Sequence, residues 1–268
     1  DYLTSPVITS LFGKLIALQL EEIWKWMGGK NFTIVEYGAG SGILCSDILQ
    51  QLSKNRKLYE QLVYYIMEKN TSHAGSIQAS FPGKVKYIQQ AEEVPQENTC
   101  ILSNELVDNF PVHIIVRKKE YREVFVGYHE DFVEVLQPVN PELTKQLDKE
   151  VYSLKEGEKG AVNLESKRWI QTIGDRLRRG VVVTIDYGYT TDSGITMNRR
   201  EDALHPVTCY YRHHRHFNPY IHIGEQDITA GVNFSALRHW GEEAGLHFAA
   251  LVPQQLFSSA LGFTEALR

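Results

Sequence analysis

The stretch Glu36-Tyr37-Gly38-Ala39-Gly40-Ser41-Gly42 decides the fold of this chain of 268 residues. It follows a short β-rich run, residues 32–35, and it leads into apolar residues that recur at helical spacing from Ile43 to Leu52. The sequence therefore predicts a strand, a tight turn and a helix. The glycines let the backbone of the turn approach a ligand closely, and the unpaired N–H groups of the helix point at the same place. We expect a polar ligand to bind there.

The spacing of the three glycines, Gly38, Gly40 and Gly42, indicates which ligand the turn binds. A dinucleotide-binding turn reads G-x-G-x-x-G, whereas here the third glycine comes one residue early and Ile43 stands in its place. A phosphate-binding loop would need Gly-Lys-Ser/Thr, which this turn lacks. Glu36 would repel a pyrophosphate, but it would attract a sulfonium or an amino group. We therefore expect a ligand that is at least partly cationic.

A second acidic residue, Glu68, ends the next predicted strand, Leu62 to Met67. In a doubly wound sheet this position lies where the ribose hydroxyls of a nucleoside bind. Acid, glycine turn and second acid together suit an adenosyl ligand with an amino-acid tail, so we predict S-adenosyl-L-methionine as the cofactor. Each signal alone also fits a plain tight turn or a solvated strand end.

The rest of the chain continues the alternation of strands and helices, which predicts an α/β fold with a mostly parallel sheet. The pattern is interrupted by closely spaced β-rich runs between residues 112 and 136, which we interpret as an antiparallel insertion. Residues 189–227 are polar and irregular and are expected to form either a long functional loop or a partly disordered segment. The other predicted helices cover residues 5–28, 72–81, 163–177 and 233–244, and the other predicted strands cover 85–88, 99–103, 181–185 and 248–252.

Composition excludes several classes of protein. The formal charge of −5, from 28 basic and 33 acidic residues, gives no positive field for nucleic acid. The three cysteines stand far apart without a CxxC pair, so they predict neither a disulfide framework nor a thiolate zinc site. No apolar run approaches the ~20 residues of a membrane span. We expect a cytoplasmic protein or, at most, a protein of an organelle matrix.

Acidic residues at the end of the fourth strand are candidates for the substrate site. In Asn104-Glu105-Leu106-Val107-Asp108, the two carboxylates can face one side of a turn and bind a cationic substrate. We expect Asn104 to bind the cofactor, and Glu105 and Asp108 to act in catalysis. The alternative is that Asn104 or Asp108 caps a helix.

A second pair of acids, Glu225 and Asp227, lies on a predicted loop and is a candidate for binding substrate. The alternative is a helix cap before residues 232–234. The histidine-rich run from Tyr210 to His216 has no carboxylate or cysteine at ligand spacing, so no metal site is predicted.

Five ordered motifs, from Thr4 to about Leu246, resemble the MidA family, a group formerly described as a domain of unknown function. They are Thr4-Ser5-Pro6 with Phe12-Gly13, residues 36–42, Asn104-Glu105-Leu106-Val107-Asp108-Asn109-Phe110-Pro111-Val112, Ile185-Asp186-Tyr187-Gly188-Tyr189, and Gly224-Glu225-Gln226-Asp227-Ile228-Thr229-Ala230. Mitochondrial members of the family are arginine methyltransferases that act in the assembly of respiratory complex I.

The resemblance implies a doubly wound, seven-stranded Rossmann-like methyltransferase sheet and S-adenosyl-L-methionine as cofactor. It also implies a protein arginine as methyl acceptor, with a respiratory-complex subunit as a candidate partner. Residues 1–111 and 163–268 would form the methyltransferase domain, and residues 112–162 an inserted β-rich region that faces the substrate.

Two rival functions remain open at this point. A non-catalytic assembly factor would keep the glycine turn and use the insertion to hold a partner. A small-molecule methyltransferase would wall its acceptor pocket with aromatic residues, for which Tyr210, Tyr211 and Phe217 are candidates. A dehydrogenase is disfavoured by the glycine spacing and by Glu36.

Overall fold

The computed structural model describes residues 10–69, 74–147, 152, 154–191 and 205–262. Contacts divide the chain into two compact units, which we call the parallel-sheet unit and the antiparallel unit. The parallel-sheet unit contains Leu3–Leu106, Asp175–Ile185 and Ala249–Arg268. The antiparallel unit contains Val107–Gly174 and Asp186–Phe248.

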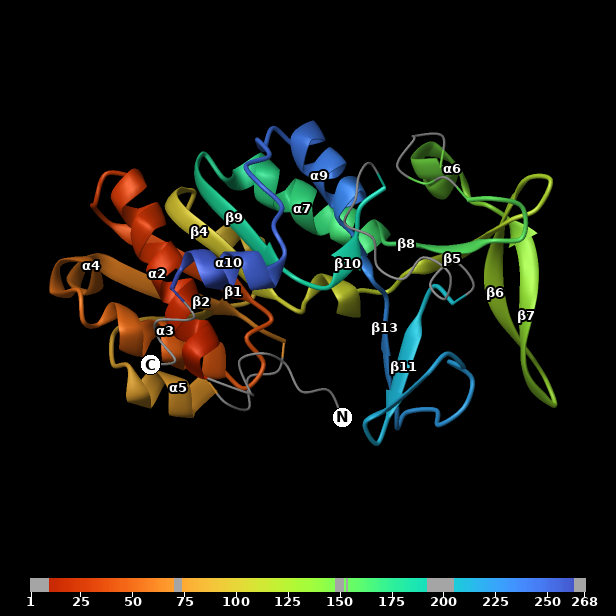
Figure 1. Cartoon of the computed structure of the whole chain (residues 1–268), viewed down its shortest axis with the longest axis horizontal. Coiled ribbons are helices and arrows are strands. Elements are labelled where there is room, and N and C mark those ends of the chain that lie inside the picture. The colour runs from red at the N-terminus through yellow and green to blue at the C-terminus, as the bar shows by residue number, and fades with distance from the viewer. Residues whose placement is uncertain (1–9, 70–73, 148–151, 153, 192–204, 263–268) are drawn as a thin grey trace. The chain divides into compact units, whose positions relative to one another are not determined.

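Five parallel strands form the sheet of the first unit, in the order β3-β2-β1-β4-β9 (Figure 1). The strands are β1 (Phe32–Tyr37), β2 (Leu62–Met67), β3 (Val85–Ile88), β4 (Glu97–Asn104) and β9 (Arg179–Ile185). The order of the strands along the chain reverses between β1 and β4. Ligands of open α/β sheets bind at the carboxyl ends of the strands beside such a switch point, and the glycine turn follows β1 at this edge.

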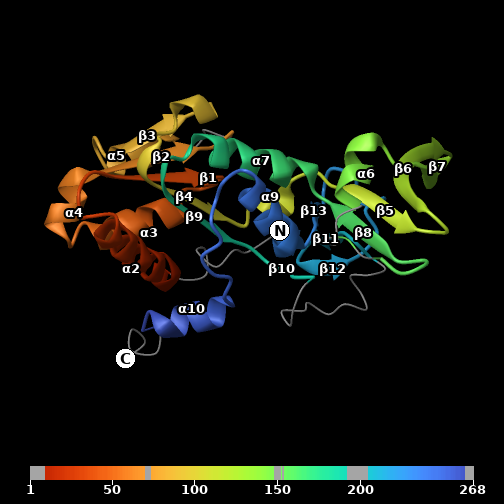
Figure 2. The same ribbon diagram turned by 90° about the horizontal axis from the view of Figure 1, so that it is seen from above.

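The helices of the parallel-sheet unit are α2 (Ser10–Trp26), α3 (Ile43–Leu52), α4 (Arg56–Gln61), α5 (Ala74–Ser80) and α10 (Gln254–Ala260). Figure 2 shows α2 and α3 on the same side of the sheet. Apolar residues of α2 recur every three or four positions, so one stripe of this helix is buried against the sheet. None of the helices in the described ranges is long and apolar enough to cross a membrane.

The described residues of the antiparallel unit form three small sheets. The largest has the strand order β7-β6-β5-β8, a second has the order β12-β11-β13, and β10 pairs with β14. Its strands are β5 (His113–Arg117), β6 (Tyr121–His129), β7 (Asp131–Pro138), β8 (Lys159–Val162), β10 (Gly188–Tyr189), β11 (Thr208–Tyr211), β12 (His214–His216), β13 (Asp227–Thr229) and β14 (Val232–Asn233). Its helices are α6 (Pro141–Leu147), α9 (Phe234–Glu243) and most of α7 (Leu164–Arg176).

The parallel sheet and its alternating helices confirm the predicted α/β class. Five strands form this sheet within the described residues, so the seven-strand count is not confirmed. The prediction of a strand at residues 248–252 is wrong, because this stretch pairs with no strand among the described residues. A strand needs such a neighbour to form hydrogen bonds with its backbone groups. The assignment of residues 112–162 as an insertion stays a prediction.

The irregular loop predicted for residues 189–227 is wrong for its second half. Residues 208–216 form β11 and β12, and β13 pairs with the other side of β11. These strands are short and rich in polar residues, so they lack the apolar alternation that identifies a strand. Residues 192–204 of this stretch, and the predicted helix start at Ser5-Pro6, lie outside the described residues.

Candidate functional site

The glycine turn after β1 has the backbone conformation that its sequence predicts. Gly38, Gly40 and Gly42 have φ angles of 72°, 53° and 76°, a region that glycine adopts without steric cost. The amide of Gly38 donates to the carbonyl of Met67 at 2.9 Å, and the amide of Gly42 donates to Ala39 at 2.8 Å. The turn is therefore tied to the carboxyl end of β2.

The three glycines differ in what surrounds them. A Cβ atom on Gly42 would lie 2.0 Å from Cδ1 of Ile77, and one on Gly38 would lie 2.8 Å from Cδ1 of Leu106. A Cβ atom on Gly40 would meet nothing within 4 Å. Gly38 and Gly42 thus lie close to the ends of neighbouring side chains, whereas Gly40 borders open space that a ligand can enter.

Helix α3 begins directly after this turn, at Ile43. Its N-cap residue is Gly42, and no side chain caps the first N–H groups of the helix. Such groups carry partial positive charge and bind carboxylates or other anions. The turn and the helix therefore offer donors to the carboxylate end of an amino-acid ligand.

Glu68 lies beside the open glycine, as its place after β2 predicts. Its Oε2 atom accepts a hydrogen bond from the amide of Gly40 at 2.9 Å. Each carboxylate oxygen can accept more than one hydrogen bond, so Glu68 can hold the turn and still accept from ribose hydroxyls.

Glu36 is buried, although its predicted role is to attract a cationic ligand at the surface of the turn. It is only 2% exposed, and the hydroxyl of Tyr64 donates to its Oε2 atom at 2.8 Å. Side chains alternate along a strand, so Glu36 shares a face with Ile34, which is part of the core. Burial raises the pKa of Glu36 to about 7, the charge of Glu68 adds to this rise, and the Tyr64 hydrogen bond opposes it. Glu36 is therefore only partly charged at neutral pH.

The carboxyl end of β4 carries buried polar atoms with no hydrogen-bond partner among the described residues. These atoms are Oγ of Ser103 and Oδ1 of Asn104. Buried acceptors normally have a partner, and a bound ligand would supply one. Glu105 follows with a φ angle of 48°, and its amide donates to the carbonyl of Ile185 on β9 at 2.8 Å. A positive φ at a residue other than glycine is costly and is concentrated at functional sites.

Asp108 belongs to the antiparallel unit, whereas Glu105 belongs to the parallel-sheet unit. The Asp108 side chain is 2% exposed and accepts hydrogen bonds from Oγ1 of Thr229 at 2.7 Å and Nδ2 of Asn109 at 2.9 Å. Burial raises the pKa of Asp108, and these hydrogen bonds oppose the rise. Asp108 is thus engaged with its own unit.

Asp186 was not among the candidate residues from the sequence, and it contacts the turn that carries Asp108. Its Oδ2 atom accepts from the amides of Val107 at 3.0 Å and Asp108 at 3.3 Å, so Asp186 caps the short 3-10 turn Val107–Asn109. Burial raises the pKa of Asp186 to about 8, and the charge of Asp108 adds to this. The available signal was its position directly after an apolar strand.

Glu225 and Asp227 are exposed and lie at the small sheet of β11 and β13. The hydroxyl of Tyr211 donates to Oε2 of Glu225 at 3.2 Å, and Asp227 pairs with Tyr210 in the sheet. Neither acid caps α9, because Oδ1 of Asn233 accepts from its first turn.

Two of the three aromatic candidates for an acceptor pocket, Tyr211 and Phe217, stack on histidine rings. Tyr211 stacks on His222 with ring centroids 3.8 Å apart, and Phe217 stacks on His205 at 4.4 Å. No group of three metal-ligating side chains occurs in the described part of the chain.

Comparison with known sequences bears on this geometry. Residues 15–252 match the model of a family described as S-adenosyl-L-methionine-dependent methyltransferases, Methyltransf_28. The chain is 27% identical to the mitochondrial protein arginine methyltransferase NDUFAF7 homolog of Drosophila melanogaster and covers 64% of that protein with 96% of its own length. It is 26% identical to NDUFAF7 of Bos taurus, with all of the chain aligned to 65% of the relative. The chain thus spans less than two thirds of the length of these relatives.

Comparison with solved structures gives the same picture. A COG1565 superfamily protein from Burkholderia thailandensis, crystallised with S-adenosyl-homocysteine, matches the whole chain and 69% of its own length. The two share 25% sequence identity with a TM-score of 0.85. This similarity covers the sheet and the glycine turn together.

Proposed function

The chain belongs to the family of S-adenosyl-L-methionine-dependent methyltransferases that its residues 15–252 match, and we propose that it methylates an arginine side chain of a protein. The observation that carries the proposal is the open space at Gly40, inside a turn whose other two glycines are closely packed. The turn stands at the switch point of the sheet, where such folds bind nucleosides. A structure of the same fold holds S-adenosyl-homocysteine, and two relatives are named protein arginine methyltransferases.

The residues at the carboxyl ends of β1, β2 and β4 fit the cofactor. Glu68 would accept from the ribose hydroxyls, because it already lies against Gly40. The N-terminus of α3 would hold the carboxylate of the amino-acid tail. The buried Oδ1 atom of Asn104 would accept from the cofactor's amino group and so gain the partner that the described residues do not give it. Glu36 lies beneath the turn and supports a cationic ligand through its partial charge.

When bound, the cofactor supplies a methyl group on a positively charged sulfur, which is already reactive toward nitrogen. The protein then has to hold the acceptor nitrogen in line with that methyl group and to accept a proton from the guanidinium. Carboxylates suit both tasks, because they pair with guanidinium through parallel hydrogen bonds. Glu105 is our candidate, and its unusual backbone conformation supports a role that depends on side-chain position.

The other acids take supporting roles in this proposal. Burial and two hydrogen bonds favour a positioning role for Asp108, which with Asp186 fixes the turn after Glu105. Glu225 and Asp227 are exposed, which suits contact with a basic protein surface rather than with the reacting nitrogen.

Incubation with methyl-labelled S-adenosylmethionine and a cell lysate tests the proposal. We expect label on methylarginine after hydrolysis of a protein, and no label with Gly40→Val as the enzyme. Label on another amino acid or on a small metabolite would replace arginine as the acceptor. Binding of S-adenosyl-homocysteine without any transfer would support the non-catalytic assembly factor instead.

A further inference from the structure

Strands β6 and β7 form a hairpin (Figure 1). Apolar side chains are exposed on both of its faces. Alternation along the strands places Phe125, Val133 and Val135 on one face and Val126, Phe132 and Leu136 on the other, and all six are exposed. A sheet face that contacts only solvent is normally polar. Contiguous exposed apolar surface of this kind is typical of interaction sites.

Among the strands that the structure describes, β7 is also an open edge of its sheet. It is the first strand in the order β7-β6-β5-β8, and all of its residues are exposed. Proteins usually protect such edges with lysine, bulges, internal proline or very short strands. β7 has eight residues, pairs with β6 without a register shift, contains no lysine, and has its proline at the last position. An extended chain can therefore add beside it through backbone hydrogen bonds.

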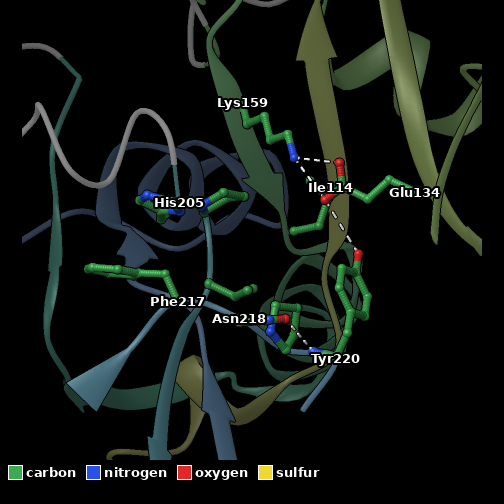
Figure 3. Close-up of a pocket in the computed structure, with 10 residues that line it drawn as sticks. Ile114, Glu134, Lys159, His205, Phe217, Asn218 and Tyr220 are labelled. Carbon is green, nitrogen blue, oxygen red and sulfur yellow. Dashed lines mark hydrogen bonds and ion pairs between the residues drawn. The ribbon is translucent and has the colours of Figure 1, made fainter. Parts of the chain in front are cut away.

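A cavity of about 240 Å³ lies next to this strand and shares Glu134 with it. Figure 3 shows Lys159 and Tyr220 reaching Glu134, with Phe217 and His205 elsewhere in the wall. The Lys159 Nζ atom lies 2.6 Å from Oε2 of Glu134. The cavity is smaller than the ~300–1,000 Å³ of small-molecule sites, so it suits one side chain of an added segment.

Charge distinguishes the occupants that could pair with β7. The charged residues of the strand are Asp131 and Glu134, both acidic, and Glu130 precedes them at the tip. Opposite charges across neighbouring strands stabilise a pair, and like charges destabilise it. A second copy of β7 would bring only acids, whereas a segment with arginine opposite Asp131 gains an ion pair.

We propose that the open edge of β7 binds an extended, arginine-bearing segment of the acceptor protein as an added strand, with one apolar side chain in the cavity at Glu134. This inference rests on the proposed function for the identity of the partner. It assigns the choice of substrate to a surface separate from the cofactor turn.

The probe is a fluorescent ten-residue peptide of alternating valine and arginine, measured by anisotropy with the full chain and no cofactor. We expect saturable binding. A peptide of alternating valine and glutamate, and a valine–arginine peptide with methylated backbone nitrogens, should bind at least about fivefold more weakly, because the first loses the ion pairs and the second loses the strand hydrogen bonds. Equal binding of either control peptide would overturn the proposal.

Variants of the chain locate the binding. Asp131→Lys should weaken binding of the valine–arginine peptide at least about fivefold. The control Val252→Lys changes an exposed apolar residue of the parallel-sheet unit and should leave binding unchanged. If Asp131→Lys binds like wild type, the edge of β7 is not the site. If instead sedimentation shows a dimer that Val133→Lys dissociates, a second copy takes the edge and the proposal is wrong.

This experiment is independent of methyl transfer. Calorimetry with S-adenosyl-homocysteine on the same variants should give unchanged affinity, because Asp131 lies in the antiparallel unit. If the wild-type chain binds the cofactor product but not the valine–arginine peptide, only the docking surface is overturned. A failed lysate assay with intact peptide binding overturns only the arginine methyltransferase.

Discussion

Gly40 is the residue at which the cofactor assignment can be tested most directly. Gly40→Val would place a branched side chain in open space that the ligand needs, at a φ angle of 53°. We expect S-adenosyl-homocysteine to bind at least about 30-fold more weakly, which corresponds to roughly 2 kcal/mol, by calorimetry.

Gly83→Val is the matched control for that change. Gly83 has a φ angle of 74° and also borders open space, so its variant suffers similar backbone strain away from the turn. Its affinity for S-adenosyl-homocysteine should stay at the wild-type value. An equal loss in both variants would mean that strain, not contact with the ligand, explains the result at Gly40.

Glu68 can be tested through the ribose itself. Glu68→Ala should weaken adenosine binding by ~1–3 kcal/mol, because it removes a charged acceptor of hydroxyl hydrogen bonds. Wild type should also prefer adenosine over 2′-deoxyadenosine, and the variant should lose that preference. If the variant keeps the full preference, Glu68 only holds the Gly40 amide.

Glu105 decides whether the carboxyl end of β4 takes part in the chemistry. Glu105→Gln keeps the shape of the side chain and removes its charge, so single-turnover methyl transfer should fall at least about 100-fold. Cofactor affinity should hardly change. Glu97→Gln, at the other end of the same strand, is the control and should keep wild-type turnover. Loss of affinity together with turnover would make Glu105 a cofactor ligand instead.

At the scale of the element, β1 carries a buried acid whose protonation is linked to folding. The pKa of Glu36 is about 7 in the folded chain against 4.5 for an ordinary glutamate, so the folded state keeps a proton that the unfolded state releases. Its contribution to stability is present below pH 4.5 and is lost as the pH rises through 7, by up to about 3 kcal/mol.

Urea unfolding at pH 5 and pH 8 measures this linkage. Glu36→Gln removes the titrating group and keeps an acceptor for Tyr64, so the loss of stability between the two pH values should be smaller than in wild type. The raised pKa values of Asp186 and Asp108 also lower stability as the pH rises. This effect is the same in wild type and in Glu36→Gln, so it cancels when the two are compared. Identical losses would mean that Glu36 is charged in the folded state.

The elements that the sequence predicted well are those with a strong hydrophobic period. β1, β2 and α3 bury apolar residues at the spacing of their structure, so their existence and order followed from the pattern. β11 and β12 were not predicted from the sequence, because they are short and polar. The run at residues 248–252 looks like a strand, but whether a strand forms depends on a neighbour that one stretch of sequence does not reveal.

The same distinction applies to the candidate site. Glu68 could be placed near the turn, because parallel strands bring their carboxyl ends to one edge. The burial of Glu36 and the capping by Asp186 depend on contacts between distant parts of the chain, and no local pattern encodes them.

At the scale of the whole molecule, the two units should respond differently to the cofactor. S-adenosyl-homocysteine at 100 times its dissociation constant stabilises the folded state by about 2.7 kcal/mol. Hydrogen exchange should slow most at residues 36–42 and at the carboxyl ends of β2 and β4, where ligand contacts are proposed. The strands β5 to β8 should change little. Equal protection of the β6–β7 hairpin would contradict the placement of the cofactor.

The pairing of β4 with β9 also determines when the sheet can be completed during synthesis of the chain. β9 completes the sheet beside β4, but residues 105–178 lie between them. At translation rates of ~5–20 residues per second, β4 waits roughly 4–15 s for its neighbour. During that time its apolar residues Cys100, Ile101 and Leu102 present an unpaired edge that attracts other unfinished chains. The ribosome therefore completes residues 107–174, about half of the antiparallel unit, while the edge of β4 is still unpaired.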